Sequence, residues 1–413
     1  MKILLVTDTY YPTVNGVVTS TNNLYKALKE LGHSVRILTL SDSFKEKISD
    51  HVYYVRAMGI SIYPDVKIKD LFHNKVVDLL IKWKPDIIHT QTEFSTMSIA
   101  KHISKELNIP MVHTYHTLWE DYTHLILRGH LITKGFVGIM SKTICDGFDC
   151  VITPTKKTKD VLEKYNITPP IEIVPTGIDL TKFEKDVPED ILTELKYLYN
   201  ITDKKVLLYV GRVSKEKNLD ELIQYFSKLI IDDGVFLIVG DGPYLKNIKE
   251  LVETLNLEKK VIFTGMVKSD EINQYYKLGN VFITASTSET QGLTYIEAMA
   301  SGLPVVCKKD KAIEELIIDN ENGFTFINEE EFIRGVNTIL NKDDISEFKK
   351  NAKITASKYS IRSFGEGVET VYKKTIANYN PLKKEYDIID KFQSIGKNIL
   401  EDINKMIDVF TKY

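Results

Sequence analysis

The sequence has few cysteines, no large excess of positive or negative charge, and no long apolar run. Its 413 residues include three cysteines, which form no CxxC pair and are too few for a disulfide framework. We therefore expect a reduced, cytosolic compartment. The formal net charge is −3, so no strongly basic domain points to nucleic acid. No stretch approaches the roughly 20 apolar residues that span a bilayer. We expect no transmembrane segment, which leaves binding to a membrane surface open.

The amino terminus combines a lysine with a short apolar run, as a secretory signal does. The run Ile3–Val6 ends after four residues, and Asp8 follows it without a small-residue cleavage site. A buried first strand therefore fits better than a signal peptide.

Short apolar segments alternate with amphipathic helical patterns along most of the chain. The first series of expected strands comprises Ile3–Val6, Ser34–Leu40, Val52–Val55, Ile87–His89, Met111–Thr114, Val151–Thr153 and Ile171–Val174. The second comprises Lys204–Val210, Phe236–Val239, Val261–Phe263, Val281–Ile283 and Val305–Cys307. Apolar strands separated by helices indicate parallel sheets covered on both faces. Because the chain is too long for one core, we predict two α/β domains.

The polar segment Thr176–Pro188 separates the two series and is the expected linker. It predicts one domain over residues 1–180 and a second over 181–380, followed by a C-terminal helix over 381–413. That helix has one apolar stripe at a 3.6-residue period, which another surface has to cover. We expect it to pack on a domain, with the N-terminal domain as the candidate. The alternative is a helix lying on a membrane, although its polar face mixes acids with lysines.

Two glycine-containing junctions between a strand and a helix are candidate phosphate sites. Gly16 precedes a helix in the first half, and Gly211, Arg212 and Lys217 lie at such a junction in the second. A helix N-terminus presents unpaired N–H groups and the positive end of the helix dipole. Arg212 and Lys217 would add two cations for a diphosphate. Each glycine alone is equally consistent with a simple turn.

The segment 288–306, SETQGLTYIEAMASGLPVV, is more specific. Seven residues separate Glu289 from Glu297, and Gly292 lets the chain turn closely before a helix expected over Leu293–Ala300. Glu297 is placed to accept hydrogen bonds from ribose hydroxyls, and Glu289 could face a sugar ring. The alternative for a helical glutamate is a solvated surface charge.

The E-x7-E arrangement, the GRVSKEKN loop and the VNGV loop together resemble a large family of retaining glycosyltransferases, of family-four type. This family includes bacterial mannosyl-, glucosyl- and sucrose-phosphate-type transferases, and the resemblance covers both domains. It implies the GT-B fold, with two Rossmann-like domains and an interdomain cleft. It also implies that Arg212 and Lys217 bind the nucleotide diphosphate, that Glu297 holds the ribose and that Glu289 contacts the donor sugar. Backbone contacts to sugar and phosphate would come from Thr290, Gln291, Gly292, Leu293 and Thr294.

The sequence departs from the motif that is commoner in this family, roughly E-G-F-G-L. Thr290 and Gln291 replace a glycine and an aromatic residue of that motif. This departure predicts an altered donor pocket. No DxD-type pair ends a strand beside these motifs, so we expect protein cations rather than a metal in the donor site. An indirect effect of Mg²⁺ stays open. No side chain is an evident covalent nucleophile, which favours front-face attack assisted by the leaving phosphate.

The run HTYHTLWEDYTHLI, residues 113–126, is the candidate for the acceptor side. His116 follows an expected strand at a carboxyl edge, where α/β proteins bind ligands, although lone histidines are more often structural. Its polar and aromatic neighbours in the loop are Tyr115, Glu120, Asp121 and Tyr122. By resemblance, His116 matches a catalytic-site histidine near the reacting sugar. Together with the segment PDIIHTQTEF upstream, this sequence is similar to that of the family branch that glucosylates 1,2-diacylglycerol at the cytoplasmic face of bacterial membranes.

Residues 122–145 contain no acidic side chain but include Arg128, Lys134 and Lys142 among many apolar residues. Such a mixture suits insertion at an anionic bilayer surface. The alternative is an ordinary buried helix with a solvated lysine rim, and only the resemblance favours the membrane. We thus expect a peripheral protein at the inner face of the membrane. Its predicted reaction transfers glucose from UDP-glucose to the 3-hydroxyl of diacylglycerol.

Three alternatives remain: a transferase with a soluble or polysaccharide acceptor, a sugar-nucleotide epimerase, or a binding module without activity. The sequence leaves open whether the donor sugar is glucose or galactose. It also leaves open the number of sugars added, the dependence on anionic lipid and the oligomeric state.

Overall fold

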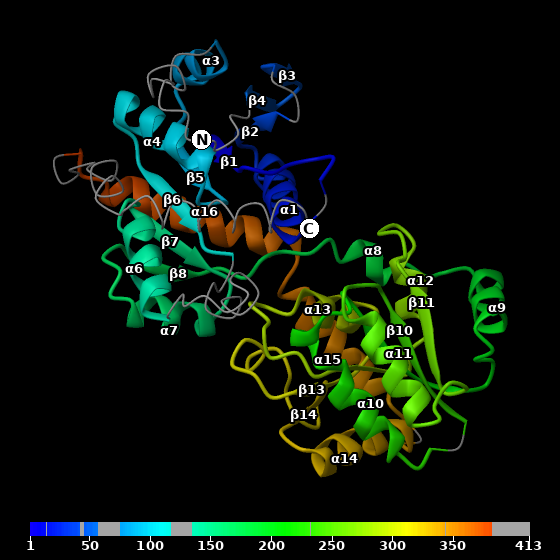
Figure 1. Ribbon diagram of the computed structural model, residues 1–413. Helices are drawn as coiled ribbons and strands as arrows, with labels where there is room; N and C mark the ends of the chain where they lie inside the picture. Colours follow the sequence, from blue (N-terminus) through cyan, green and yellow to red (C-terminus); the bar gives the residue numbers. More distant parts are fainter. Residues whose placement is uncertain are drawn as a thin grey trace. The chain divides into compact units, whose positions relative to one another are not determined.

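The computed structural model describes residues 1–13, 15–41, 45–56, 75–116, 134–231, 233–342 and 344–381 (Figure 1). The chain divides into two compact units. The first consists of Met1–Gly177 together with the chain from Ile361 onward, and the second is Ile178–Ser360.

The first unit is built on an eight-stranded sheet with the order β3-β4-β2-β1-β5-β6-β7-β8. All neighbouring strands pair in parallel except β3, which pairs with β4 in the antiparallel sense. The strands are β1 (Lys2–Val6), β2 (Ser34–Ser41), β3 (Lys47–Ser49), β4 (Val52–Arg56), β5 (Ile87–Thr90), β6 (Met111–Thr114), β7 (Cys150–Thr153) and β8 (Ile171–Ile173). The helices are α1 (Gly16–Glu30), α3 (Lys75–Trp83), α4 (Ser95–Leu107), α6 (Lys134–Cys145), α7 (Lys156–Lys164) and α16 (Ile361–Asn378).

Strand β1 shows why a sheet of this kind needs apolar residues on both faces. Ile3 and Leu5 are fully buried in a cluster with residues of α1 and α16. Leu4 and Val6 are equally buried in a second cluster with α3 and α4. Successive side chains of a strand point to opposite faces, so helices cover the sheet on both sides. Burial of each such side chain stabilises the fold by about 1.5–3 kcal/mol.

Helix α16 departs from the expected domain boundaries. The second unit ends at Ser360, well before the expected residue 380, and α16 returns to the first unit. Phe364 packs in the same core cluster as β1, and Gly365 faces α1, where an added Cβ would lie 2.6 Å from the Cβ of Ala27. The helical period alone does not say which core a helix covers. The helix expected over 381–413 lies, apart from residue 381, outside the described residues.

The second unit contains a six-stranded parallel sheet with the order β11-β10-β9-β12-β13-β14. The strands are β9 (Lys205–Val210), β10 (Gly234–Val239), β11 (Val261–Gly265), β12 (Val281–Thr284), β13 (Val305–Lys308) and β14 (Gly323–Phe326). The helices are α8 (Thr181–Glu184), α9 (Glu189–Leu198), the 3₁₀ turn η1 (Lys215–Lys217), α10 (Leu219–Ser227), α11 (Leu245–Thr254), α12 (Ile272–Tyr276), α13 (Leu293–Ala300), α14 (Glu329–Leu340) and α15 (Ser346–Ser357).

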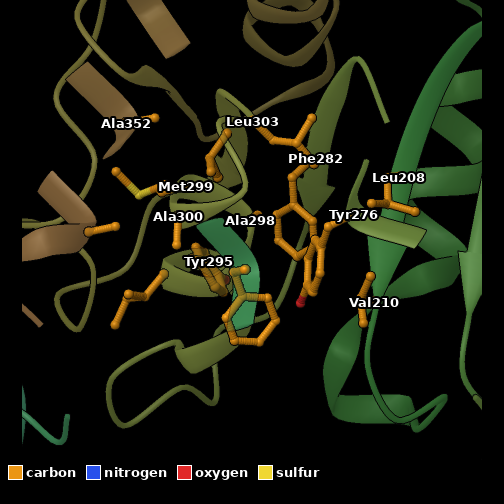
Figure 2. Close-up of a cluster of buried hydrophobic side chains, with 14 of the residues drawn as sticks. Leu208, Val210, Tyr276, Phe282, Tyr295, Ala298, Met299, Ala300, Leu303 and Ala352 are labelled. Carbon is orange, nitrogen blue, oxygen red and sulfur yellow. The ribbon is translucent and has the colours of Figure 1, made fainter. Parts of the chain in front are cut away.

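The core beside α12 and α13 contains several aromatic side chains (Figure 2). Tyr276 and Phe282 are fully buried, and Tyr295 is 1% exposed. Helix α13 contributes a nearly continuous set of buried apolar residues, interrupted at Glu297. A carboxylate among buried apolar residues is uncommon unless it has a partner or a function. Within the ranges that the structure describes, no helix is both long enough and apolar enough to cross a bilayer.

Candidate active site

The loop after β9 brings the predicted phosphate-binding residues to the carboxyl edge of the second sheet. A Cβ added to Gly240, at the end of β10, would lie 1.9 Å from the carbonyl oxygen of Gly211. The two loops therefore pack backbone against backbone, and only glycine at position 240 permits this approach. Tyr209 donates its hydroxyl to the carbonyl of Arg212 at 2.9 Å. The exposed Arg212 and the turn η1 that carries Lys217 follow at this edge.

Lys217 and Glu289 form an ion pair, with 2.6 Å between Nζ and Oε1. The same ammonium lies 3.4 Å from the hydroxyl of Ser286. Strands β9 and β12 are neighbours in the sheet, and their carboxyl ends bring together two residues that are 72 positions apart. The side chains are 21% and 17% exposed, so the charges lie in a partly desolvated place. A cation and a carboxylate at one sheet edge suit a phosphate and a sugar hydroxyl, respectively.

Gly292 provides the turn from this edge into α13. Its φ of 78° lies in the left-handed region, and an added Cβ would come within 2.9 Å of the ring of Tyr295. Helix α13 then runs over Leu293–Ala300, which confirms the predicted bounds. Gln291, which replaces the family's aromatic residue, is 4% exposed. The altered pocket predicted there thus concerns a buried side chain rather than a surface one.

Glu297 lies one turn into α13 and accepts a hydrogen bond from the hydroxyl of Tyr276, with 2.8 Å to Oε2. Burial raises the pKa of Glu297 to about 7, although the Tyr276 bond and the nearby Lys182 oppose this shift. The group therefore titrates around neutral pH. A carboxylate in this position can accept two hydroxyl hydrogens when ionised.

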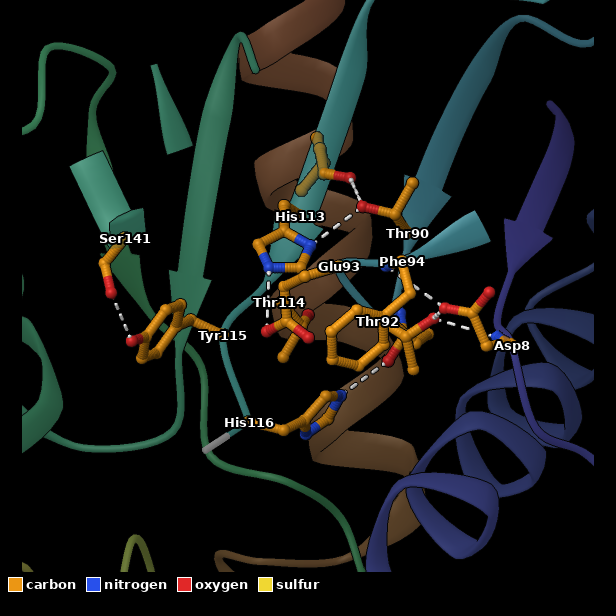
Figure 3. Close-up of polar contacts among 12 residues, drawn as sticks. Asp8, Thr90, Thr92, Glu93, Phe94, His113, Thr114, Tyr115, His116 and Ser141 are labelled. Atoms are coloured by element: carbon orange, nitrogen blue, oxygen red, sulfur yellow. Dashed lines mark hydrogen bonds and ion pairs between the residues drawn. The ribbon is translucent and has the colours of Figure 1, made fainter. Parts of the chain in front are cut away.

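In the first unit, His116 lies at the carboxyl edge beside β5 and β6 (Figure 3). Its Nε2 is 2.9 Å from Oε1 of Gln91, which directly follows β5. Burial, with a smaller effect of His113, lowers the pKa of His116 to about 3. The imidazole is therefore neutral at physiological pH. Because the amide oxygen can only accept, Nε2–H donates to it, and Nδ1 carries the lone pair.

Two further histidines in this region belong to the sheet interior. His89 is fully buried between the hydroxyls of Tyr372 and Thr114, each 2.7 Å from a ring nitrogen. Burial places the pKa of His89 well below its usual value. His113 bonds the hydroxyl of Thr90 at 2.8 Å. His89 thus links β5, β6 and α16 through hydroxyl partners, whereas the second ring nitrogen of His113 lies 3.5 Å from the carboxylate of Glu93.

Tyr115 is a correction to the predicted acceptor residues. Its side chain is 1% exposed, packs in an apolar cluster with residues of α6 and α7, and bonds the hydroxyl of Ser141 at 2.8 Å (Figure 3). A buried hydroxyl with a partner in the protein is a core residue.

Of the other predicted acceptor residues, the structure describes the side chain of Lys142 alone. Glu120, Asp121, Tyr122 and Arg128 lie outside the described residues. Lys134 begins α6, and its side chain is not among those described. Lys142 of α6 pairs with Asp146 at 2.8 Å and donates to the carbonyl of Asn166. Ile139, on the same helix, is 65% exposed.

Gly16 is the first residue of α1 in the first unit, whereas the other predicted donor residues belong to the second. The helix is capped by Asn15, whose side chain accepts from the N–H of Val18 at 2.9 Å. In the described part of the chain, no group of three or more His, Cys, Asp or Glu side chains could hold a metal ion.

Comparison with known proteins agrees with this division of the chain. A model described as Glycosyltransferase Family 4 matches residues 14–182, and one described as Glycosyl transferases group 1 matches residues 194–359. The α-monoglucosyldiacylglycerol synthase of Streptococcus pneumoniae is 36% identical over 92% of this chain and 87% of its own length. The enzyme of that name from Acholeplasma laidlawii is 32% identical over 92% of this chain and 98% of its own. The chain belongs to the GT-B glycosyltransferases of family-four type.

Two solved structures share its fold. The Anabaena protein Alr3699/HepE in complex with UDP-glucose matches 90% of this chain and 100% of its own, with a TM-score of 0.69 and 18% identity. Sucrose-phosphate synthase from Thermosynechococcus elongatus matches 92% of this chain and 100% of its own, with a TM-score of 0.71 and 21% identity. The predicted family and the predicted pair of Rossmann-like domains are thus confirmed.

Sequence reasoning missed several residues of this glycosyltransferase's two sheet edges. Asp8, which follows β1, accepts hydrogen bonds from the hydroxyl of Thr92 at 2.5 Å and from the N–H of Thr96 at 2.9 Å, and so caps α4. Gln91 and Tyr276 orient His116 and Glu297 from other elements. Polar residues just after a strand are a usable signal for Asp8 and Gln91. No local signal marks Tyr276, because it lies in a short helix far along the chain from its partner.

Proposed function

We propose that this glycosyltransferase moves glucose from UDP-glucose to the 3-hydroxyl of 1,2-diacylglycerol, with retention, to give α-monoglucosyldiacylglycerol. The observation that carries the proposal is the likeness to two α-monoglucosyldiacylglycerol synthases over 92% of the chain, which includes both halves. The arrangement of charge at the edge of the second sheet supports it independently of those names.

The donor would bind mainly to the second unit. Lys217 and Arg212 would neutralise the diphosphate, Glu297 would accept from the ribose and Glu289 from the glucose. An ammonium has three hydrogens, so Lys217 can donate to Glu289 and to a phosphate oxygen in the same complex. Negative charge on the diphosphate grows as the bond to the sugar breaks, and cations held by the fold stabilise it at that moment.

The acceptor hydroxyl would meet a neutral side chain. With a pKa of about 3, His116 is no acid at physiological pH, and its lone pair on Nδ1 suits acceptance from a sugar or glycerol hydroxyl. In the reaction, the C1–oxygen bond to UDP breaks, and the acceptor oxygen forms its bond on the same face. The hydroxyl proton passes to an oxygen of the departing diphosphate, so protons and charge balance without an enzyme-bound intermediate.

We further propose that the protein works at the inner face of the membrane, without crossing it. Support comes from the acid-free segment 122–145 and from α6, where the exposed Ile139 and the partly exposed Lys142 are three residues apart. Residues at this spacing share one helical face. A cation beside an exposed apolar side chain suits an anionic lipid surface, at about 1 kcal/mol per cation.

The test is transfer of label from radiolabelled UDP-glucose into vesicles that contain diacylglycerol, with and without anionic phospholipid. We expect organic-soluble label only with diacylglycerol, and more of it with anionic lipid. UDP-galactose is the matched donor control. If label enters oligosaccharide and not lipid, the acceptor assignment is wrong. Release of UDP and free sugar without any acceptor would favour an epimerase.

A further inference from the structure

Tyr276 is a buried side chain whose hydroxyl ends at the candidate ribose carboxylate. It is the last residue of α12 and is fully buried, and it donates to Oε2 of Glu297 at 2.8 Å. Its ring packs between Phe183 and Phe282, with centroid distances of 5.7 and 6.2 Å, as Figure 2 shows for Phe282. A ring enclosed in this way cannot change rotamer without opening the core, so the position of the hydroxyl is fixed.

The bond leaves the two oxygens of the carboxylate in different situations. Oε2 is held by Tyr276, and among the described residues no second side chain donates to the carboxylate of Glu297. Glu297 is also partly exposed, as are Leu293 and Thr294 one turn earlier, whereas the other residues of α13 are buried. A carboxylate that is anchored through one oxygen, on a side chain only partly exposed, offers acceptor positions in a set direction. Vicinal hydroxyls of a ribose are donors with matching spacing.

We propose that Tyr276 is a positioning residue of the donor site, which holds the Glu297 carboxylate in place for the ribose of a nucleoside diphosphate. The inference rests on the donor part of the proposed function and not on the acceptor. Tyr276 itself does not touch the nucleotide in this arrangement. Its effect is transmitted through Glu297.

The ionisable groups around Glu297 give the direction of the effect. Burial raises the pKa of Glu297 to about 7, while the hydroxyl of Tyr276 and the ammonium of Lys182 on α8 lower it. Tyr276 stays neutral, because burial holds its pKa well above the usual value. Removal of the hydroxyl takes away one of two stabilising partners, so the carboxyl should ionise only at higher pH.

The experiment measures UDP binding to the full-length protein by calorimetry from about pH 6 to about pH 9, across the range where Glu297 titrates. We expect the unaltered protein to bind UDP with a midpoint near 7. In Tyr276→Phe the midpoint should rise by about one unit, which weakens binding about fivefold at pH 7 and by less than about twofold at pH 9. Turnover at saturating donor should change little, because the ribose contact is the same before and during reaction.

Tyr275→Phe is the matched control. Tyr275 precedes Tyr276 in α12 and is also buried, but its hydroxyl lies 3.3 Å from that of Tyr199 instead of contacting Glu297. This variant should keep the midpoint of the unaltered protein. Glu297→Gln should remove the part of the pH dependence that Glu297 contributes and leave only the ionisation of the terminal phosphate of UDP, which has a pKa of about 6. Adding Tyr276→Phe to it should have no further effect on that profile.

Each outcome decides between the assignments. A Tyr276→Phe protein with the unaltered midpoint and affinity would overturn the inference while UDP binding still stands. If Tyr276→Phe fails to fold, a Glu297→Gln protein that keeps the pH profile of the unaltered protein would overturn it instead. Failure of the unaltered protein to bind UDP would overturn the donor assignment and this inference together. UDP binding without glucosylation of lipid would overturn only the proposed acceptor.

Discussion

The two sheet edges hold their polar groups in different ways. In the second unit, Lys217 and Glu289 keep full charges in contact at 2.6 Å. In the first, His116 contacts an amide oxygen, and His113 lies 3.5 Å from the carboxylate of Glu93. Desolvation disfavours any charge, and a buried charge persists only where a partner of opposite sign or hydrogen bonds stabilise it. An ion pair suits a diphosphate and the neutral His116 suits a hydroxyl, which is the difference expected between a donor side and an acceptor side.

The largest expected effect is loss of the cation in the second unit. Lys217→Ala should lower kcat/KM by about 100-fold to 1,000-fold, because one preorganised charge no longer stabilises the departing diphosphate. Arg212→Ala should act in the same direction. Steady-state transfer of labelled glucose measures the change. Lys215→Ala, an exposed lysine of the same turn η1, is the control and should stay within about twofold of the unaltered enzyme. Equal losses in both lysine variants would refute a specific role for Lys217.

The next effect concerns pH and the charged edge. Because the pKa of Glu297 is about 7, UDP binding should strengthen about tenfold between about pH 6 and about pH 8. The sign follows from the ribose hydroxyls, which donate to the ionised carboxylate and not to the acid. Binding titrations at constant ionic strength test this. Affinity that falls as pH rises through 7 would contradict the assigned contact.

A single substitution should place a negative charge directly beside His116. Gln91→Glu places a carboxylate where an amide oxygen lies 2.9 Å from the imidazole of His116, which raises the pKa of that histidine from about 3. Below the new pKa, His116 is protonated and can no longer accept a hydroxyl. We expect kcat at saturating donor, where the Glu297 contact no longer limits binding, to fall as pH decreases, to about one tenth near pH 6. The unaltered enzyme and Gln91→Leu should lack this acid limb. Its presence in Gln91→Leu would assign it to another group.

The smallest expected effect tests how α16 joins the first unit. Gly365→Ala would set a methyl group 2.6 Å from the Cβ of Ala27, and the overpacking should lower the free energy of unfolding by about 1–3 kcal/mol. Chemical denaturation measures it. Gly16→Ala is the control, because no atom lies within 4 Å of the added Cβ there, and it should change stability by less than about 1 kcal/mol. A Gly365→Ala protein with an unchanged free energy of unfolding would show that α1 and α16 can move apart without loss of stability.

Much of the local structure could be predicted because it depends on neighbouring residues. Apolar period and turn chemistry predicted β1 and the whole of α13, including its start after Gly292. Strand β14 (Gly323–Phe326) was missed, since its sequence GFTF is short and begins with glycine. That glycine is required because an added Cβ would lie 2.0 Å from the carbonyl oxygen of Val305 on the neighbouring strand. Only the pairing of β13 with β14 reveals this reason.

In the candidate site, too, one part could be predicted from the sequence and another part could not. The sequence by itself determined the residue types and motifs of the donor edge, because phosphate, ribose and sugar each demand a particular chemistry at a loop or helix start. The tertiary structure decided which groups meet: Lys217 with Glu289, Tyr276 with Glu297, and Gln91 with His116. It also placed α16 in the first unit. The order of strands in a sheet and the packing of a buried ring bring distant residues together, and neither leaves a periodic trace in the chain.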